Sequence, residues 1–404
     1  MVAHLTRLLG PAQLDLAEET VQETMLRALQ TWPQQGVPPS AAAWLFRVAH
    51  NVAIDAVRHR RMMGDKTDEV VAELARSASA PPGDPDLEEQ LRDDELRMIF
   101  MCCHPEIPRD ARVALSLKTV GGFGVREIAR AFLAEDAAVA QRLVRAKRQI
   151  REQRLTLDMP LGAELAPRLD SVLEVIYLMF NEGYAAHAGE DLIRQDLCVE
   201  ALRLGRLVAG SSIAEPRVDA LVALMALEAA RWPARVDASG DLILLEAQDR
   251  SRWDPHLLAL GFFHFDRSIT GEHVSEYHVQ AAIAATHVRA ADSESRDWPM
   301  VLGMYDQLYE LNPSPVVALN RAVAVAKVHG AQEGLAAIEP LSEDPKLENY
   351  YLRLAVRGHL LLELARPAEA AGCFRAALDC PCSEPERRFL RRKLEACEAA
   401  THAG

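Results

Sequence analysis

Six cationic side chains recur along residues 136–154, a segment whose apolar residues have helical spacing. A shorter segment with the same spacing, residues 125–132, precedes it across a turn at 133–135. A short helix, a tight turn and a longer basic helix form the helix-turn-helix pattern, whose second helix enters the major groove of DNA. The cations are Arg142, Arg145, Lys147, Arg148, Arg151 and Arg154. The pattern predicts DNA binding; a solvated basic helix face is the alternative.

Two kinds of DNA contact are expected of this basic helix. Base edges need hydrogen-bond donors in its N-terminal half, and Gln141, Arg142 and Arg145 can supply them. Phosphates need further cations, which residues 147–151 can supply.

A second cationic cluster surrounds a tryptophan in residues 40–66. Cations mixed with an aromatic ring and an amide suit melted, single-stranded DNA, because they attract phosphates and contact unpaired bases. The cluster consists of Trp44, Arg47, His50, Asn51, Arg58, Arg60, Arg61 and Lys66. Trp44 is equally well explained as a core residue, so this cluster alone indicates function only weakly.

The elements that position these residues are expected to be helices. Aromatic residues make up only 5% of the 404 residues, while alanine and leucine are plentiful, which favours helix over sheet. Single hydrophobic cores usually stop growing at about 250–300 residues. We therefore predict an all-α protein of two or more domains.

The net charge of −14 argues by itself against a nucleic-acid binder. The charge is unevenly distributed, however. Residues 1–158 hold 21 basic and 23 acidic side chains, whereas residues 159–404 hold 24 basic and 36 acidic ones. We therefore expect the C-terminal part to avoid DNA phosphates and the N-terminal part to contact them.

The seven cysteines predict a reduced protein. Residues 1–7 lead into no hydrophobic stretch, and apolar runs such as residues 220–227 are too short to span a bilayer. We therefore expect a cytoplasmic protein without a membrane partner. Residues 102–104 and 380–382 carry cysteines without a second ligand pair at zinc-finger spacing, so we predict buried thiols and neither metal nor cofactor.

Breaks in composition divide the chain into four predicted parts: residues 1–62, an acidic and proline-rich linker at 63–92, the helix-turn-helix part at 93–158, and a helical extension at 159–404. The end of the extension suggests a repeat. Tyr305, Ile338 and Phe374 are spaced by 33 and 36 residues, close to the 34 residues of a tetratricopeptide repeat.

Three stretches resemble RNA polymerase sigma factors of the extracytoplasmic-function (ECF) type. Residues 15–29 resemble region 2.2, residues 40–61 resemble regions 2.3 and 2.4, and residues 125–148 resemble region 4.2. The resemblance implies a transcription initiation factor and no enzyme. It implies docking on the β′ clamp helices and the β flap of core polymerase, capture of melted minus-10 DNA, and reading of the minus-35 duplex.

The resemblance assigns residues to each partner. The expected contacts with core polymerase are Asp15, Glu18, Val21, Gln22, Glu23 and Leu26. The expected contacts with minus-10 DNA are Trp44, Arg47, Asn51, Asp55, Arg58, Arg60 and Arg61. The expected contacts with minus-35 DNA are Arg126, Gln141, Arg142, Arg145, Lys147 and Arg148.

The extension narrows the resemblance to a subgroup. Residues 180–184, 248–254 and 319–324 resemble sigma factors with a fused C-terminal tetratricopeptide-like domain of the DUF6596 type, and residues 102–105 fit that subgroup. A fused domain implies a regulator of sigma activity that answers to an unknown protein or small molecule. The candidate regulatory residues are Asn181, Glu182, Tyr184, Asp249, Arg250, Arg252 and Trp253. Interhelical ion pairs and a core tryptophan are the alternative.

Two positions depart from the sigma pattern. Gly124 and Val125 stand where a serine or threonine cap is usual, which should weaken the helix start by about 0.5–2 kcal/mol. Ala138 stands where relatives commonly have threonine, so minus-35 preference should differ from theirs.

Three other functions compete with this interpretation. A helix-turn-helix regulator that does not act through core polymerase would leave residues 15–29 unexplained. An enzyme in the extension would need a nucleophile elbow, a phosphate loop or a zinc-binding His-Glu-x-x-His motif, and the sequence has none. A scaffold of helical repeats would leave the basic N-terminal segments unexplained.

Overall fold

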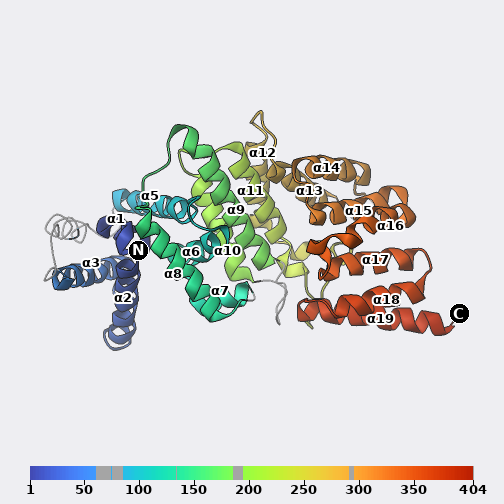
Figure 1. Ribbon diagram of the computed structural model, residues 1–404, viewed down its shortest axis with the longest axis horizontal. Helices are drawn as coiled ribbons and strands as arrows, with labels where there is room; N and C mark the ends of the chain where they lie inside the picture. The colour runs from blue at the N-terminus through green and yellow to red at the C-terminus, as the bar shows by residue number, and fades with distance from the viewer. Residues whose placement is uncertain (61–73, 75–84, 133, 185–193, 291–294, 404) are drawn as a thin grey trace. The chain divides into compact units, whose positions relative to one another are not determined.

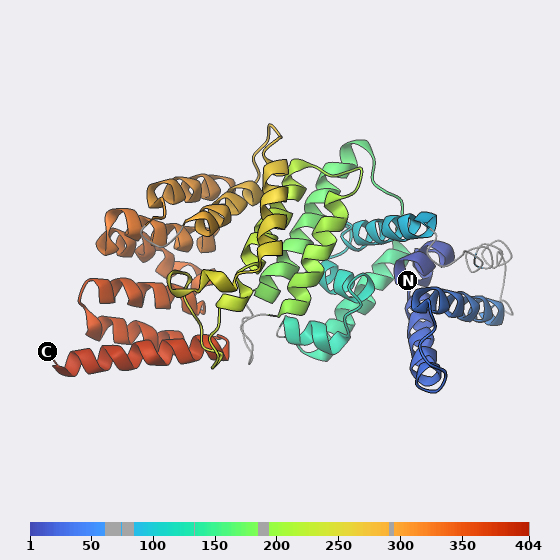
Figure 2. The same cartoon turned by 180° about the vertical axis from the view of Figure 1, so that it is seen from behind.

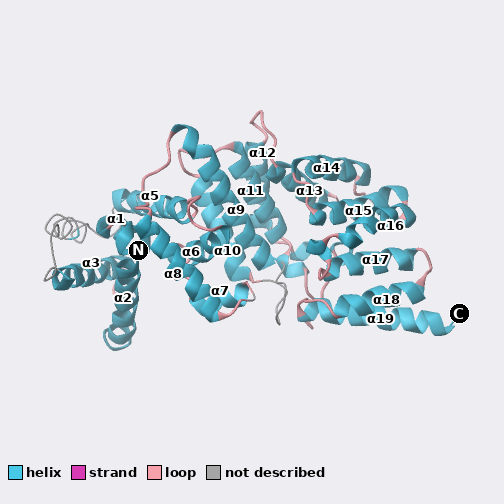
Figure 3. Ribbon diagram, in the orientation of Figure 1, coloured by secondary structure: helices cyan, strands magenta, loops and turns pink. Residues whose placement is uncertain are grey.

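The computed structural model describes residues 1–60, 74, 85–132, 134–184, 194–290 and 295–403. The chain forms two compact units, Met1–Leu178 and Met179–Gly404. The described residues are almost wholly helical, and they contain no strand beyond an isolated bridge between Val236 and Leu242 (Figure 3). The prediction of an all-α fold is confirmed.

The first unit begins with helices α1 (Val2–Leu9), α2 (Leu14–Gln35) and α3 (Ala41–Arg60), with a 3-10 turn η1 (Pro11–Gln13) before α2 (Figure 1). Their shared core is small and aliphatic. It contains Leu5, Leu8, Ala17, Ala49, Ala53, Ile54 and Leu74. These buried positions recur at helical spacing, so each helix has one face in the core and another in solvent.

Helix α5 (Pro85–Cys102) contacts α1 and so joins the first helices to the rest of this unit. The buried Asp94 carboxylate binds two groups of α1, with His4 Nδ1 at 2.8 Å and Arg7 Nε at 2.7 Å. Residues 85–92 of the predicted linker therefore form the first turns of a helix. The remainder of that linker, apart from Leu74, lies outside the described residues.

Helices α6 (Arg109–Thr119), α7 (Val125–Ala131) and α8 (Asp136–Glu152) follow as the predicted helix-turn-helix. The apolar face of α8 is buried as its spacing indicates, at Val139, Leu143, Ala146 and Ile150. Gly124 caps α7 without a side chain, but Glu127 accepts a hydrogen bond from its N–H at 2.6 Å. That bond satisfies one backbone donor at the helix start that lacks a partner within the helix.

The cysteines at 102 and 103 are buried beside hydroxyl groups of α6. Cys102 Sγ lies 3.2 Å from Thr119 Oγ1, and Cys103 Sγ lies 3.7 Å from Ser116 Oγ. Burial raises the pKa of Cys103 to about 12, so it is a neutral thiol at physiological pH. No cluster of three potential metal ligands occurs among the residues that the structure describes.

A short 3-10 turn η3 (Gly162–Glu164) precedes the long helix α9 (Leu165–Tyr184), and the division between the two units falls within this helix. The part of α9 up to Leu178 packs in the first unit. Arg168 Nη2 donates to the carbonyl oxygen of Phe100 at 2.7 Å, and Arg112 donates to Ser171 Oγ at 3.3 Å.

The second unit continues with α10 (Gln195–Ala209), α11 (Pro216–Ala229), α12 (Pro255–Ser268) and α13 (Glu276–Arg289). Helix α11 is buried on nearly every side, because α10, α12 and α13 all contact it. Between α11 and α12 the chain forms three 3-10 turns, η4 (Trp232–Ala234), η5 (Leu245–Ala247) and η6 (Arg250–Arg252).

The unit ends in antiparallel helices that each contact the next: α14 (Trp298–Leu311), α15 (Pro315–His329), α16 (Ala331–Ile338), α17 (Tyr351–Glu363), α18 (Pro367–Leu378) and α19 (Glu384–Ala403). Two turns, η7 (Glu339–Glu343) and η8 (Pro345–Leu347), separate α16 from α17. Helices α17 to α19 lie side by side in both views (Figures 1 and 2).

Close helix approach in this part depends on glycines. A Cβ atom at Gly358 would lie 3.0 Å from the Phe374 ring, and one at Gly334 would lie 2.5 Å from Ala326. The predicted repeat residues Ile338 and Phe374 are both buried. The tetratricopeptide likeness and the four predicted domain boundaries stay predictions. No helix in the described part of the chain has the length and apolar character needed to cross a membrane.

Candidate nucleic-acid interface

The residues expected at minus-10 DNA gather on one face of α3. Arg47, Asn51, Asp55 and Arg58 are all exposed, and their spacing of three or four residues places them in one row along the helix. The opposite face carries the buried Ala49 and Ala53. The row offers guanidinium and amide donors to solvent, as a contact with DNA requires. The Arg60 side chain and Arg61 lie outside the described residues.

Trp44 lies at the start of this row and is half-buried. Its ring makes an edge-to-face contact with Trp32 at the end of α2, with centroids 5.4 Å apart. His50, by contrast, is buried and donates from Nδ1 to the carbonyl oxygen of Phe46 at 2.7 Å. Burial lowers the pKa of His50, so it is neutral at physiological pH and belongs to the core.

The residues expected at core polymerase divide into two groups along α2. Farther along the helix, from residue 22 on, Gln22 and Leu26 are exposed, and Glu23 accepts a hydrogen bond from Arg27 at 2.9 Å. In the first half Val21 packs against the core, and Asp15 and Glu18 make ion pairs with α8.

Two apolar residues beside this group had not been assigned to the polymerase surface. Leu26 is 53% exposed, and Met25 and Leu29 next to it are 41% and 71% exposed. Three large apolar side chains in solvent on one helix form a surface that suits a protein partner. Helical spacing of apolar residues does not by itself distinguish these two exposed side chains from buried ones.

The cations of α8 are mostly engaged with carboxylates. Lys147 Nζ lies 2.8 Å from both Asp15 Oδ1 and Glu18 Oε2, and Arg151 Nη1 lies 2.9 Å from Asp15 Oδ2. Arg142 Nε lies 3.2 Å from Asp110 Oδ2 of α6. The pairs of Lys147 and Arg151 join the helix expected at minus-35 DNA to the helix expected at core polymerase.

The pair of Lys147 with α2 is partly shielded from water. The side chains of Lys147 and Glu18 are 13% and 10% exposed. Burial acts to lower the pKa of Lys147, but the hydrogen bonds that Lys147 donates to Asp15 and Glu18 outweigh burial and raise that pKa. Burial likewise acts to raise the pKa of Asp15, but Lys147 and Arg151 outweigh it and lower that pKa. Both groups are therefore charged at neutral pH.

The remaining residues of the expected minus-35 set lie in solvent. Gln141, Arg145 and Arg148 are exposed, and Arg148 pairs only weakly with Glu152 one turn along, at 3.4 Å. Arg126 of α7 lies 3.6 Å from Asp136 at the start of α8. These side chains are free to reorient toward a duplex, since exposed pairs contribute only about 0–1 kcal/mol.

The candidate regulatory residues of α9 lead into a buried polar chain in the second unit. Tyr184 stacks on Phe180, lies beneath the Arg235 guanidinium at 4.1 Å, and donates a hydrogen bond to Glu228. Burial raises the pKa of Tyr184 to about 12. Asn181 and Glu182 precede it and are half-buried.

Glu228 and Arg231 connect this tyrosine to the second motif, residues 248–254. Arg231 Nη1 lies 3.0 Å from Glu228 Oε2, and Arg231 Nε donates to Gln248 at 3.4 Å. Sequence reasoning did not select Glu228 or Arg231, because both lie on or after the buried α11 and belong to no recognised motif.

Within the second motif the side chains bind their own surroundings. Asp249 Oδ1 accepts hydrogen bonds from the backbone and side chain of Ser251, and Arg252 donates to the carbonyl oxygen of Val236 at 3.4 Å. Arg250 lies over the buried Trp253 ring at 4.2 Å. The two motifs thus belong to one internal network. A regulatory role for it stays a prediction.

Family comparisons agree with the geometry of the first unit. The family described as Sigma-70 region 2 matches residues 1–62, and Sigma-70, region 4 matches residues 97–150. A family of unknown function, DUF6596, matches residues 168–269.

Several curated proteins are similar to this chain. An uncharacterized protein of Rhizobium meliloti is 40% identical over 398 residues, covering 96% of this chain and 92% of that protein. A probable RNA polymerase sigma factor, RfaY of Xanthomonas campestris, is 32% identical over 34% of each chain. The ECF RNA polymerase sigma factor SigG of Mycobacterium tuberculosis is 26% identical over 46% of this chain and 53% of its own length. No solved structure matches this chain.

The two sigma matches cover the helices that carry the candidate interface, and the DUF6596 match begins within α9. The sigma-named relatives are matched over about a third and about half of their lengths, whereas the Rhizobium protein is matched over nearly all of it. This chain belongs to the ECF RNA polymerase sigma factors that carry a C-terminal DUF6596 domain.

Proposed function

We propose that this sigma factor binds the β′ clamp helices of core polymerase through the exposed second half of α2. The observation that carries the proposal is the row of exposed apolar side chains at Met25, Leu26 and Leu29. A helix-turn-helix regulator that acts without polymerase would gain nothing from such a row in water. The β flap is the proposed partner of the helix-turn-helix part.

Replacing Leu26 by aspartate tests this contact. Leu26→Asp should abolish retention of the chain by immobilised core polymerase, because a charge would enter an apolar interface. Val37→Asp is the matched control, since Val37 is 66% exposed but lies beyond the end of α2. Retention of Leu26→Asp at the level of the control would favour the regulator that does not act through polymerase.

DNA recognition is assigned to the other two helices. The exposed row on α3 would hold the melted minus-10 strand, and Gln141 and Arg145 of α8 would read the minus-35 duplex. Lys147 can reach phosphate only after leaving Asp15 and Glu18, so binding to a promoter would exchange these carboxylates for phosphates. Transcription by core polymerase from a library of promoter sequences would test the assignment and give the preferred elements.

The C-terminal extension is proposed to be required for activity. Support comes from the start of α9, which lies within the first unit and buries Leu169, Val172 and Ile176 there. Arg109 of α6 also forms an ion pair with Glu174 of α9. Deletion after Asp158 removes this helix together with the rest of the extension.

Two truncations distinguish a structural role of the extension, in which α9 supports the sigma helices, from a regulatory role. Deletion after Asp158 should lower transcription in vitro, because it exposes the apolar surface that α9 covers. Deletion after Tyr184 keeps α9 and tests the rest of the extension alone, with circular dichroism confirming that both variants are folded. Higher transcription from the chain truncated after Asp158 than from the full-length chain would show that the extension is inhibitory. Equal transcription from all three chains would exclude both a required and an inhibitory extension.

A further inference from the structure

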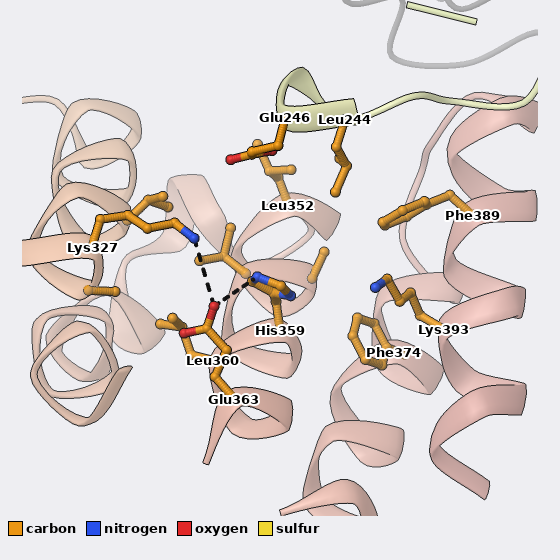
Figure 4. Close-up of a pocket in the computed structure, with 14 residues that line it drawn as sticks. Leu244, Glu246, Lys327, Leu352, His359, Leu360, Glu363, Phe374, Phe389 and Lys393 are labelled. Atoms are coloured by element: carbon orange, nitrogen blue, oxygen red, sulfur yellow. Dashed lines mark ion pairs between the residues drawn. The ribbon is translucent and has the colours of Figure 1, made fainter. Parts of the chain in front are cut away.

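The second unit contains a cavity of about 180 Å³ between its last helices (Figure 4). Its walls come mainly from the alternate helices α15, α17 and α19, and the segment around η5 contributes Leu244 and Glu246. Alternate helices of a helical array share one concave side, where such arrays bind ligands. None of the candidate regulatory residues lines this cavity.

The walls are largely apolar. Leu352, Leu360, Phe374 and Phe389 surround the space in Figure 4. Smaller aliphatic side chains such as Val323 also line it. An engineered protein cavity of about 150 Å³ holds one benzene molecule. The space therefore suits an apolar body of about one ring or six to eight carbon atoms.

Four charged side chains lie around this apolar space, and they differ in their partners. Glu363 lies 3.8 Å from Lys327 and 3.3 Å from His359 Nε2, so its charge is already balanced. Burial lowers the pKa of His359 although Glu363 acts to raise it, which makes the imidazole neutral at physiological pH. Glu246 is exposed at the edge of the cavity.

Lys393 differs from the other charged groups. Its amine points into the cavity in Figure 4 and lies 5.5 Å from the centre of the Phe389 ring. Among the described residues no carboxylate lies within ion-pair distance of it. A cation beside an apolar space, with the nearby carboxylate already paired, favours a ligand that brings its own negative charge.

We propose that this cavity is a binding site for a small monocarboxylic acid with a compact apolar body, whose carboxylate pairs with Lys393. The body fills the space among α15, α17 and α19, and Glu246 at the rim disfavours a second negative charge. The site is separate from the polymerase and DNA surfaces, so its occupancy is measurable without either partner.

Two probes of the same shape and opposite charge test the ligand class. Phenylacetate and 2-phenylethylamine are titrated into the full-length protein by isothermal calorimetry. Phenylacetate should bind with a dissociation constant of about a millimolar or tighter, as its size allows, and the amine should not bind. Absence of phenylacetate binding, or equal binding of the amine, would overturn the proposal.

Two substitutions test the placement. Lys393→Met keeps the length of the side chain and should weaken phenylacetate binding about tenfold or more, because a charge-assisted contact is lost. Lys346→Met, at an exposed lysine of η8, is the matched control and should leave binding unchanged. Ala355→Phe should fill the space and abolish binding. Thermal unfolding confirms that each variant is folded, and unchanged affinity in Lys393→Met would contradict the assignment whatever Ala355→Phe does.

Discussion

Helices α3 and α8 carry similar cationic side chains, yet two of those on α8 are held by ion pairs with another helix. On α3 the guanidinium groups of Arg47 and Arg58 lie in solvent, on the face opposite the core. On α8 Lys147 and Arg151 are held by carboxylates of another helix. If residue type alone decided DNA binding, the cations of the two helices would be equally available to DNA.

The difference arises from what faces each helix. The first turns of α2 place Asp15 and Glu18 against α8, whereas no described acidic side chain forms an ion pair with Arg47 or Arg58 of α3. A cation between two carboxylates and largely removed from water is exchanged for a phosphate only at a cost, because one set of charge-assisted bonds must break before another forms. Availability for DNA therefore depends on tertiary contacts as well as on charge.

The largest expected effect is a difference in DNA form: substitutions on α8 should weaken duplex binding, and substitutions on α3 should weaken binding of single-stranded DNA. Arg145→Ala should weaken binding to a minus-35 duplex by about 1–3 kcal/mol if its guanidinium reads a base edge. Arg47→Ala should leave duplex binding unchanged and weaken binding to single-stranded minus-10 DNA. Fluorescence anisotropy with the two probes measures both, and Arg27→Ala on α2 is the control. Equal losses on both probes would remove the distinction between the helices.

A smaller effect is expected from removing the carboxylates that form ion pairs with the cations of α8. Asp15→Asn combined with Glu18→Gln removes both carboxylates that hold Lys147, so duplex affinity should rise several-fold at low salt, and the gain should shrink as salt screens the charges. Glu23→Gln is the matched control, because among the described residues Glu23 pairs only with Arg27 of its own helix. Duplex affinity equal to that of the control would show that the ion pairs do not compete with DNA.

The smallest effect concerns pH. The pKa of Asp15 is lowered in the folded protein, because Lys147 and Arg151 outweigh the effect of burial. Its contribution to stability is therefore present above the unfolded-state pKa of about 3.9 and is lost as the pH falls through the lower folded value. The hydrogen-exchange protection of residues 14–20, relative to the intrinsic exchange rate at each pH, should fall over that acidic range in the wild-type protein. In Asp15→Asn the protection should already be lower at pH 7 and show no such transition; a transition in that variant would assign the pH effect to another group.

Local pattern was sufficient for much of the first unit. The spacing of Val139, Leu143, Ala146 and Ile150 predicted which face of α8 is buried, and the row on α3 was predicted to carry DNA contacts and proved to be exposed. Helical periodicity depends only on residues three or four positions apart, so a sequence contains it directly. The same periodicity does not reveal that Met25 is exposed, because the second half of α2 extends beyond the small core that covers its first half.

The sequence by itself therefore determined the helices, the sigma resemblance and the sites of positive charge. Only the tertiary structure decided which charges are available: Lys147 pairs with Asp15 across 132 positions, and Tyr184 reaches Glu228 across 44. It also decided that Lys393 faces an apolar cavity bounded mainly by three separate helices. Pairing and enclosure depend on which helix faces lie opposite each other, and side chains distant in sequence meet only when the cores that hold those helices have formed.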